Sequence, residues 1–360
     1  EEHGSKGVLG DVGIHILDFA TFIAGMDATQ ISCLLQTFDK APGAAEETDR
    51  LLREAEQDAA SKGVVGIRDY EMAENIDTWI NRFAAGINGL RVDAGVYPER
   101  LRAAIDAGWH TGKELPGSAG LGHVGAMKLI SDGSLNTRSA YCSTPYSGIE
   151  PLTYGTLSYT PQQIEDYMRL ATEHGFDIAC HAIGDEANTI ALNAVAATHA
   201  HGSIEHAQML KPVDIPRFAE LGLTASIQPQ HAMDDRDVIT RFWANPAGIP
   251  YPFRALHDAG TTLRMGSDAP VAPLDPWLAI SAAVLGAESS DREPFQPEQC
   301  LDVHTSLAAS TATGRDRLAS GDPADVVLLD ADPYAADTPE AMRAMPQHVV
   351  MTLLCGERTY

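Results

Sequence analysis

Two histidines each end an apolar run of the kind that forms a buried strand. His181 ends the run that begins at Ile178, and His206 ends the next run, which begins at Ser203. Asp268 follows a third run, and Lys128 lies inside a fourth. Imidazole and carboxylate bind Zn²⁺ and similar ions, which lower the pKa of bound water to about 7. The sequence therefore predicts a hydrolytic metal site in which Asp268 is the general base.

Short apolar runs alternate with helical segments along most of the chain, which indicates parallel βαβ units. We expect a TIM-type (β/α) barrel, incomplete or rearranged because one of its eight strands is unaccounted for. The carboxyl ends of barrel strands meet at one mouth, so the four side chains should converge there. The predicted strands are Val64–Arg68, Leu90–Val92, Val124–Ile130, Phe176–His181, Gly202–Glu205, Leu223–Ile227 and Thr262–Met265.

Local signals place one helix and two further strands. Thr160 is a predicted N-cap, Pro161 takes the first helical position, and Gly175 should end that helix after His174. The runs 323–330 and 349–354 have no crossover helix between them, so they predict a small separate β-sheet. We therefore expect three parts: a fragment over 1–42, a hydrolase barrel over 43–318, and a β-sandwich-like layer over 319–360.

Composition limits the partners. The chain has 25 Lys+Arg against 50 Asp+Glu, a net charge of -25, which disfavours binding to nucleic acid or to an anionic membrane. No run is long enough to span a membrane. Five dispersed cysteines favour neither disulfides nor a cysteine zinc site, so we expect a soluble cytoplasmic protein with a small-molecule substrate. The oligomeric state is not predicted.

Several segments resemble the amidohydrolase family 3 enzymes of the amidohydrolase superfamily, which include N-substituted formamide deformylases. The likeness extends over residues 44–360 in family order. It is carried by MKLISDGSLNTRSAYCSTPY, ACHAIGDEAN, GSIEHAQML, ASIQPQHAMDDRD, LRMGSDAPVAPLDPW and GDPADVVLLDADP. The resemblance implies a metal-dependent hydrolase of non-peptide carbon–nitrogen bonds, acting on an amide, a formamide or a cyclic amide.

The resemblance also assigns roles to residues. His181 and His206 would be metal ligands, and Asp268 a ligand and general base. Lys128 stands where related enzymes often carry a carboxylated lysine that bridges two metals; unmodified, it would pair with Asp132 or another acid. Zinc is the expected metal, with manganese, iron, cobalt and nickel as alternatives. The matching segments further place three residues in the substrate pocket: Arg138, Gln228 and His231.

One family feature is missing from the sequence. Intact relatives carry a His-x-His pair on the first barrel strand, but here the only such spacing is His199–His201, which follows a predicted helix. We therefore expect one bound ion where intact relatives hold two. A catalytically impaired remnant of an amidohydrolase is the alternative interpretation.

Residues 1–40 resemble a piece of the C-terminal domain of the Gfo/Idh/MocA dehydrogenases. Asp11 and His15 match that family's catalytic pair, so an oxidoreductase is a third interpretation, although no nucleotide-binding domain precedes them. The glycines of 120–125 do not supply one, because they enter a strand rather than open a helix. The apolar run Ile31–Phe38 could take the place of the missing barrel strand.

Overall fold

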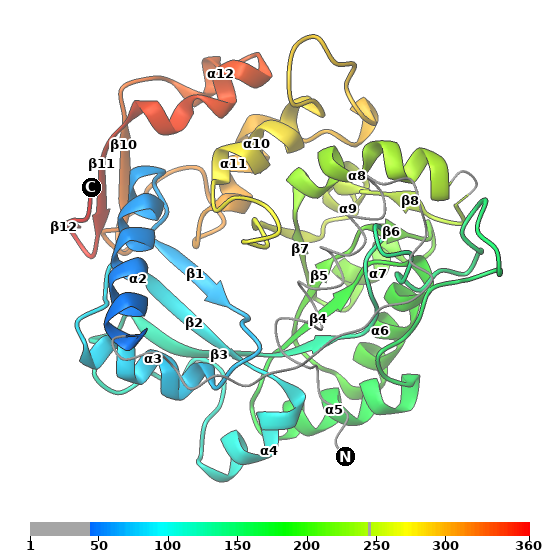
Figure 1. Ribbon diagram of the computed structural model, residues 1–360, viewed down its shortest axis with the longest axis horizontal. Helices are drawn as coiled ribbons and strands as arrows, with labels where there is room; N and C mark the ends of the chain where they lie inside the picture. The colour runs from blue at the N-terminus through cyan, green and yellow to red at the C-terminus, as the bar shows by residue number, and fades with distance from the viewer. Residues whose placement is uncertain (1–43, 244–245) are drawn as a thin grey trace. The chain divides into compact units, whose positions relative to one another are not determined.

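The computed structural model describes residues 44–243 and 246–360, with side chains described from Thr48 onward. In that part of the chain, seven parallel strands form one curled sheet (Figure 1). The order in the sheet follows the order in the sequence: β1 (Gly66–Asp69), β2 (Arg91–Val96), β3 (Gly122–Ile130), β4 (Ile178–Ala182), β5 (Gly202–His206), β7 (Thr224–Ile227) and β9 (Thr262–Met265). Each of the seven predicted strands is confirmed to within a few residues.

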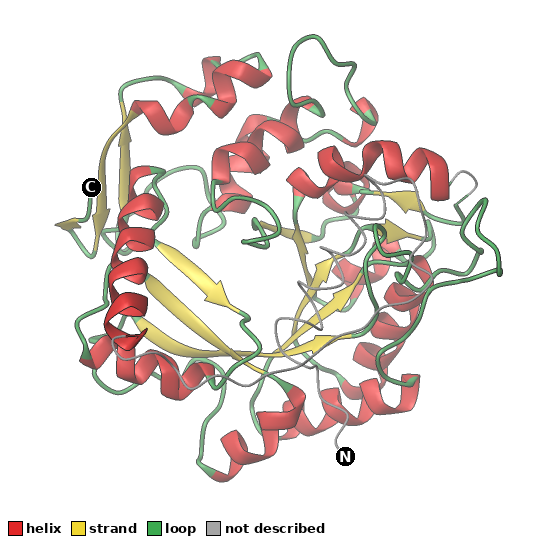
Figure 2. Ribbon diagram, in the orientation of Figure 1, coloured by secondary structure: helices red, strands yellow, loops and turns green. Residues whose placement is uncertain are grey.

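Helices follow most of the strands and pack on the convex side of the sheet (Figure 2). They are α2 (Ala44–Ser61), α3 (Asn75–Ala84), α4 (Pro98–Asp106), α5 (Pro161–Glu173), α6 (Asp185–Thr198), α7 (Ile215–Glu220), α8 (Pro229–Phe242), α9 (Phe253–Asp258), α10 (Pro276–Leu285), α11 (Val303–Ser310) and α12 (Pro339–Arg343). The predicted helix is α5: Thr160 forms a capping box with Gln163, and His174 is the C-cap.

The two faces of the curled sheet differ in polarity. Side chains such as Val92, Ile178 and Ile204 are fully buried in the main apolar core. Alternate residues such as Asp93 and Glu205 are polar and lie on the opposite face, since successive side chains on a strand point to opposite sides. The hydrophobic effect therefore fixes the register and leaves the strand ends free to carry chemistry.

A small antiparallel sheet follows the barrel strands, built from β10 (Val326–Leu329), β11 (Val349–Leu354) and β12 (Glu357–Arg358). It lies beside α2 (Figure 1), where Thr352 Oγ1 donates to the carbonyl of Ala60 at 2.7 Å. Arg91 of β2 donates to Asp325, just before β10, through Nε at 2.5 Å and Nη2 at 3.1 Å. These two contacts, which we call the junction, join the small sheet to α2 and to strand β2 of the barrel sheet.

The architecture is mixed α/β, an incomplete TIM-type barrel with a small C-terminal sheet, as predicted. A second two-stranded sheet pairs β6 (Met209–Leu210) with β8 (Ile249–Pro250). The predicted boundary at residue 318 stays a prediction. The proposal that Ile31–Phe38 replaces a barrel strand, and the dehydrogenase-like match over 1–40, fall outside the described residues. No described helix is both long and apolar enough to cross a membrane.

Candidate metal centre

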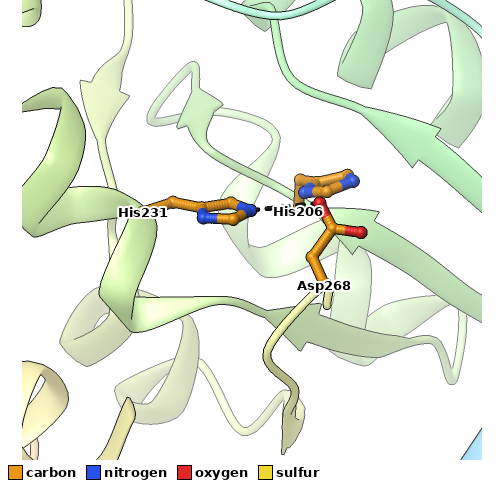
Figure 3. A group of neighbouring side chains, drawn as sticks. All are labelled: His206, His231 and Asp268. Atoms are coloured by element: carbon orange, nitrogen blue, oxygen red, sulfur yellow. Dashed lines mark hydrogen bonds and ion pairs between the residues drawn. The ribbon is translucent and has the colours of Figure 1, made fainter. Parts of the chain in front are cut away.

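The carboxyl ends of three barrel strands bring His206, His231 and Asp268 together (Figure 3). His206 ends β5, His231 lies in the first turn of α8 directly after β7, and Asp268 follows β9. One ligand atom from each residue lies within 4.8 Å of the other two. We call these three residues the centre; among the described residues they are the one group of His, Cys, Asp or Glu so placed.

Contacts inside the centre fix the orientation of its side chains. His231 Nε2 lies 3.1 Å from Asp268 Oδ2, and the rings of His206 and His231 stack with centroids 5.9 Å apart. Both histidines are buried, whereas the Asp268 side chain is 41% exposed. The carboxylate is therefore the solvent-accessible member of the centre, and the two imidazoles are its buried members.

The backbone is strained at two of the three positions. His206 has a φ of 74° and Asp268 a φ of 58°, both in the left-handed region that non-glycine residues rarely adopt. Such conformations cost roughly 1–3 kcal/mol each and persist where the surrounding structure enforces them, which is frequent at functional sites. The surrounding structure therefore holds His206 and Asp268 in these conformations at a cost in stability, and it thereby sets where their side chains point.

His206 Nδ1 is buried and has no hydrogen-bond partner among the described residues. Burial, together with electrostatic repulsion from His181, Lys128 and His231, lowers the pKa of His206 well below its ordinary value. A neutral imidazole keeps a lone pair for a ligand bond. Two imidazoles and one carboxylate, with one nitrogen left unsatisfied, form a donor set that fits a divalent cation such as zinc.

His181 of β4 lies beside the centre but outside the three-residue group. Its ring meets that of His206 edge-on, with centroids 4.4 Å apart, while its Nε2 lies 3.3 Å from Asp132 Oδ1. The structure thus brings the two predicted histidine ligands into contact. Their role as ligands stays a prediction.

Lys128 of β3 is buried, and its Nζ lies 5.0 Å from the centroid of the Tyr70 ring, a cation–π distance. The expected pairing of unmodified Lys128 with Asp132 is not what the structure shows. Both oxygens of Asp132 instead accept hydrogen bonds from backbone N–H groups that follow β3 and β4. Asp132 is the nearest acid in the sequence, but its carboxylate is already taken up by these donors.

The predicted substrate-binding residues occupy different positions. Gln228 is buried between β7 and α8; its Nε2 donates to the carbonyl of Ser226, and its Oε1 lacks a partner among the described residues. Arg138 is half-buried in the loop after β3, with its guanidinium 5.5 Å from the ring of Phe242. His231 lies in the centre itself, which favours a role at the reacting group over one in the outer pocket.

The sequence analysis missed a polar network around the buried carboxylate of Asp235. Asp235, one helical turn after His231, accepts hydrogen bonds from Asn136 Nδ2 and from Tyr251 Oη, both at 2.6 Å. Burial raises the pKa of Asp235, although these hydrogen bonds and the charge of His231 oppose the rise. The network joins the loop after β3 to α8 and β8. The spacing of an acid four residues after a histidine was the available signal.

Comparison with known proteins extends these observations. The chain is 29% identical to YtcJ of Bacillus subtilis (strain 168), over 82% of this chain and 59% of that protein. It is 25% identical to the N-substituted formamide deformylase of Arthrobacter pascens, over 60% of this chain and 42% of that enzyme. The chain thus spans about half the length of these relatives.

A solved structure supports the same grouping. An uncharacterized metal-dependent hydrolase from Pyrococcus horikoshii OT3 is 26% identical, with a TM-score of 0.60 over 69% of this chain and 50% of that one. The family model described as amidohydrolase family matches residues 21–360, which include the seven barrel strands and the small sheet. The chain belongs to the amidohydrolase family.

Proposed function

We propose that this chain is a divalent-metal-dependent hydrolase of non-peptide carbon–nitrogen bonds, acting on a small amide, formamide or cyclic amide. The observation that carries the proposal is the convergence of His206, His231 and Asp268 at the carboxyl ends of neighbouring strands. Active sites of β/α barrels are built at this end. Family membership and the metal-dependent neighbour support a hydrolase in general, and the bond type is the proposed step.

A divalent cation held by His206, His231 and Asp268 would polarise a carbonyl and make bound water acidic enough to react near neutral pH. Asp268 is the exposed acceptor of the group, so its carboxylate takes the proton of the attacking water. In the metal-free chain, His231 is hydrogen-bonded to that carboxylate and orients it. His181 packs edge-on against His206, next to these three residues.

The proposed substrate class rests on the family membership and on the similarity to a formamide deformylase. Gln228 and Arg138 are the residues that would bind the substrate carbonyl or its side group. The unsatisfied Gln228 Oε1 can accept a hydrogen bond from the N–H of an amide. This residue would therefore favour amides over esters, which offer no such donor.

The two other interpretations have less support. A catalytically impaired remnant is not favoured, since the strand ends still bring three candidate metal ligands together. An oxidoreductase rests only on residues 1–40, and the family match already begins at residue 21. One bound ion per chain, with zinc as the metal and Lys128 as a carboxylated lysine in loaded protein, remains part of the proposal.

The test is hydrolysis by the purified full chain after loading with Zn²⁺. N-substituted formamides, small amides and cyclic imides are assayed against the corresponding esters. Asp268→Asn should lower the rate by about 10²–10⁴-fold, the usual contribution of a general base. Asp258→Asn is the matched control. Asp258 ends α9, its side chain is 62% exposed, and like Asp268 it lies next to a histidine, here His257. Equal rates for wild type and Asp268→Asn would refute the assignment.

A further inference from the structure

Three consecutive residues after β3 contact His181. The carbonyl of His181 accepts hydrogen bonds from Ser131, through the backbone N at 3.2 Å and through Oγ at 2.5 Å. The ring nitrogen Nε2 lies 3.3 Å from Asp132 Oδ1 and 3.4 Å from the carbonyl oxygen of Gly133. The segment thus fixes both the backbone and the ring of His181.

Both oxygens near His181 Nε2 are acceptors: the Gly133 carbonyl is hydrogen-bonded to it, and Asp132 Oδ1 lies within ion-pair distance. A backbone carbonyl cannot donate. The Asp132 side chain is fully buried, and each of its oxygens already accepts a backbone N–H: Oδ1 from Ile183 at 3.1 Å, Oδ2 from Gly184 and Tyr141, each at 2.9 Å. A nitrogen that faces two acceptors is satisfied only when it carries the hydrogen. Nε2 is therefore the protonated nitrogen of His181.

A neutral imidazole has one N–H and one lone pair, so the assignment of Nε2 also decides the state of Nδ1. We propose that Asp132 is a positioning residue which, with the carbonyl of Gly133, holds His181 in the Nε2–H tautomer and leaves Nδ1 as the atom offered to a divalent cation. The tautomer follows from the contacts alone; its use for a cation rests on the proposed function. Carboxylates that orient ligand histidines in this way are common in metal sites.

The competing explanation is that Asp132 only anchors the loop after β3. Asp185 supplies a matched control, because it is also fully buried and accepts from the backbone N of Ser143, in the same loop, at 2.9 Å. Its side chain contacts Ser143 and Lys211 rather than a histidine. Asp185→Asn should therefore weaken the loop anchor without affecting the ring of His181.

The first measurement is the tautomer itself in the metal-free full chain. Long-range ¹H–¹⁵N correlation of ¹⁵N-histidine-labelled protein at about pH 8.5, above the ordinary imidazole pKa of about 6.5, distinguishes the two ring nitrogens. His181→Gln identifies the signals among those of the 13 histidines. The proposal expects a protonated Nε2 in wild type and in Asp185→Asn, and a mixture of tautomers in Asp132→Asn. A protonated Nδ1 in wild type would overturn it, even if Asp132→Asn fails to fold.

The second measurement is the affinity for Zn²⁺ alone, by competition with a chromophoric chelator. Asp132→Asn should bind Zn²⁺ about 10–100-fold more weakly than wild type, the usual effect of losing such a partner, and Asp185→Asn should match wild type. An equal loss of Zn²⁺ affinity in both variants would mean that Asp132 only anchors the loop, and it would overturn the positioning role. Wild type with the expected tautomer but no Zn²⁺ binding would refute the proposed function and leave the tautomer assignment standing.

Discussion

Polar groups are hydrogen-bonded at the junction, whereas one buried polar group is left without a described partner at the centre. At the junction, Arg91 and Asp325 form two hydrogen bonds, and Thr352 donates to a backbone carbonyl. At the centre, His206 Nδ1 is buried without a partner among the described residues, and the backbone of His206 is left-handed. An unsatisfied buried polar group costs roughly 1–3 kcal/mol. The contrast indicates that the junction stabilises the fold and that the centre is arranged for a ligand.

The largest expected effect is at the centre. His206→Ala removes a proposed metal ligand, so the affinity for Zn²⁺ should fall more than about 100-fold. Losing a residue that only hydrogen-bonds to a ligand usually costs about 10–100-fold. The free energy of unfolding of the metal-free chain should change much less than the free energy of Zn²⁺ binding. Chelator competition and urea unfolding measure the two quantities. Unchanged Zn²⁺ affinity in this variant would contradict the claim that the centre, unlike the junction, is arranged for a ligand.

The next effect is at the junction. Asp325→Asn weakens the bonds from Arg91 and the bond from the backbone N of Cys355 at 2.8 Å, so it should lower the free energy of unfolding by about 1–3 kcal/mol. The Zn²⁺ affinity should stay at the wild-type value. Glu165→Gln is the control, because it breaks an exposed pair with Arg169 that should contribute less than about 1 kcal/mol. Equal losses in the two variants would contradict a specific role for the junction.

The smallest effect is the pH dependence of the junction. Burial alone would raise the pKa of Asp325, but the hydrogen bonds from Arg91 and Cys355 and the charge of Arg91 lower it below its ordinary value. A lowered pKa in the folded state stabilises the protein above the unfolded pKa of about 3.9, and this contribution is lost as the pH falls through the folded value. The difference in unfolding free energy between wild type and Asp325→Asn should therefore be constant near neutrality and shrink below about pH 4. A difference that grows on acidification would contradict this sign.

The sequence predicted the barrel well because hydrophobic period and turn chemistry act locally. The runs that became β4 and β5, and the cap at Thr160, were readable without tertiary information. The centre was predicted in part: His206 and Asp268 follow recognisable strands, and His231 was placed in the substrate pocket rather than beside Asp268. That contact depends on how α8 begins after β7, which is set by packing.

Two further features could not be predicted from the sequence. The left-handed backbone of His206 could not be read from residue type, because only a small fraction of non-glycine residues adopt this conformation. The partner of unmodified Lys128 was expected to be the nearby acid Asp132. Its carboxylate instead accepts hydrogen bonds from backbone N–H groups of two loops. Tyr70 of the loop after β1 contacts the lysine instead, across strands that are distant in sequence.

The most direct test of the account is the number of Zn²⁺ ions that the purified full chain retains after exhaustive dialysis, measured by elemental analysis. The account predicts one ion per chain in wild type and loss of that ion in the double variant His206→Ala, Asp268→Asn. A wild-type chain that retains no ion, or a double variant that retains the same amount as wild type, would contradict it.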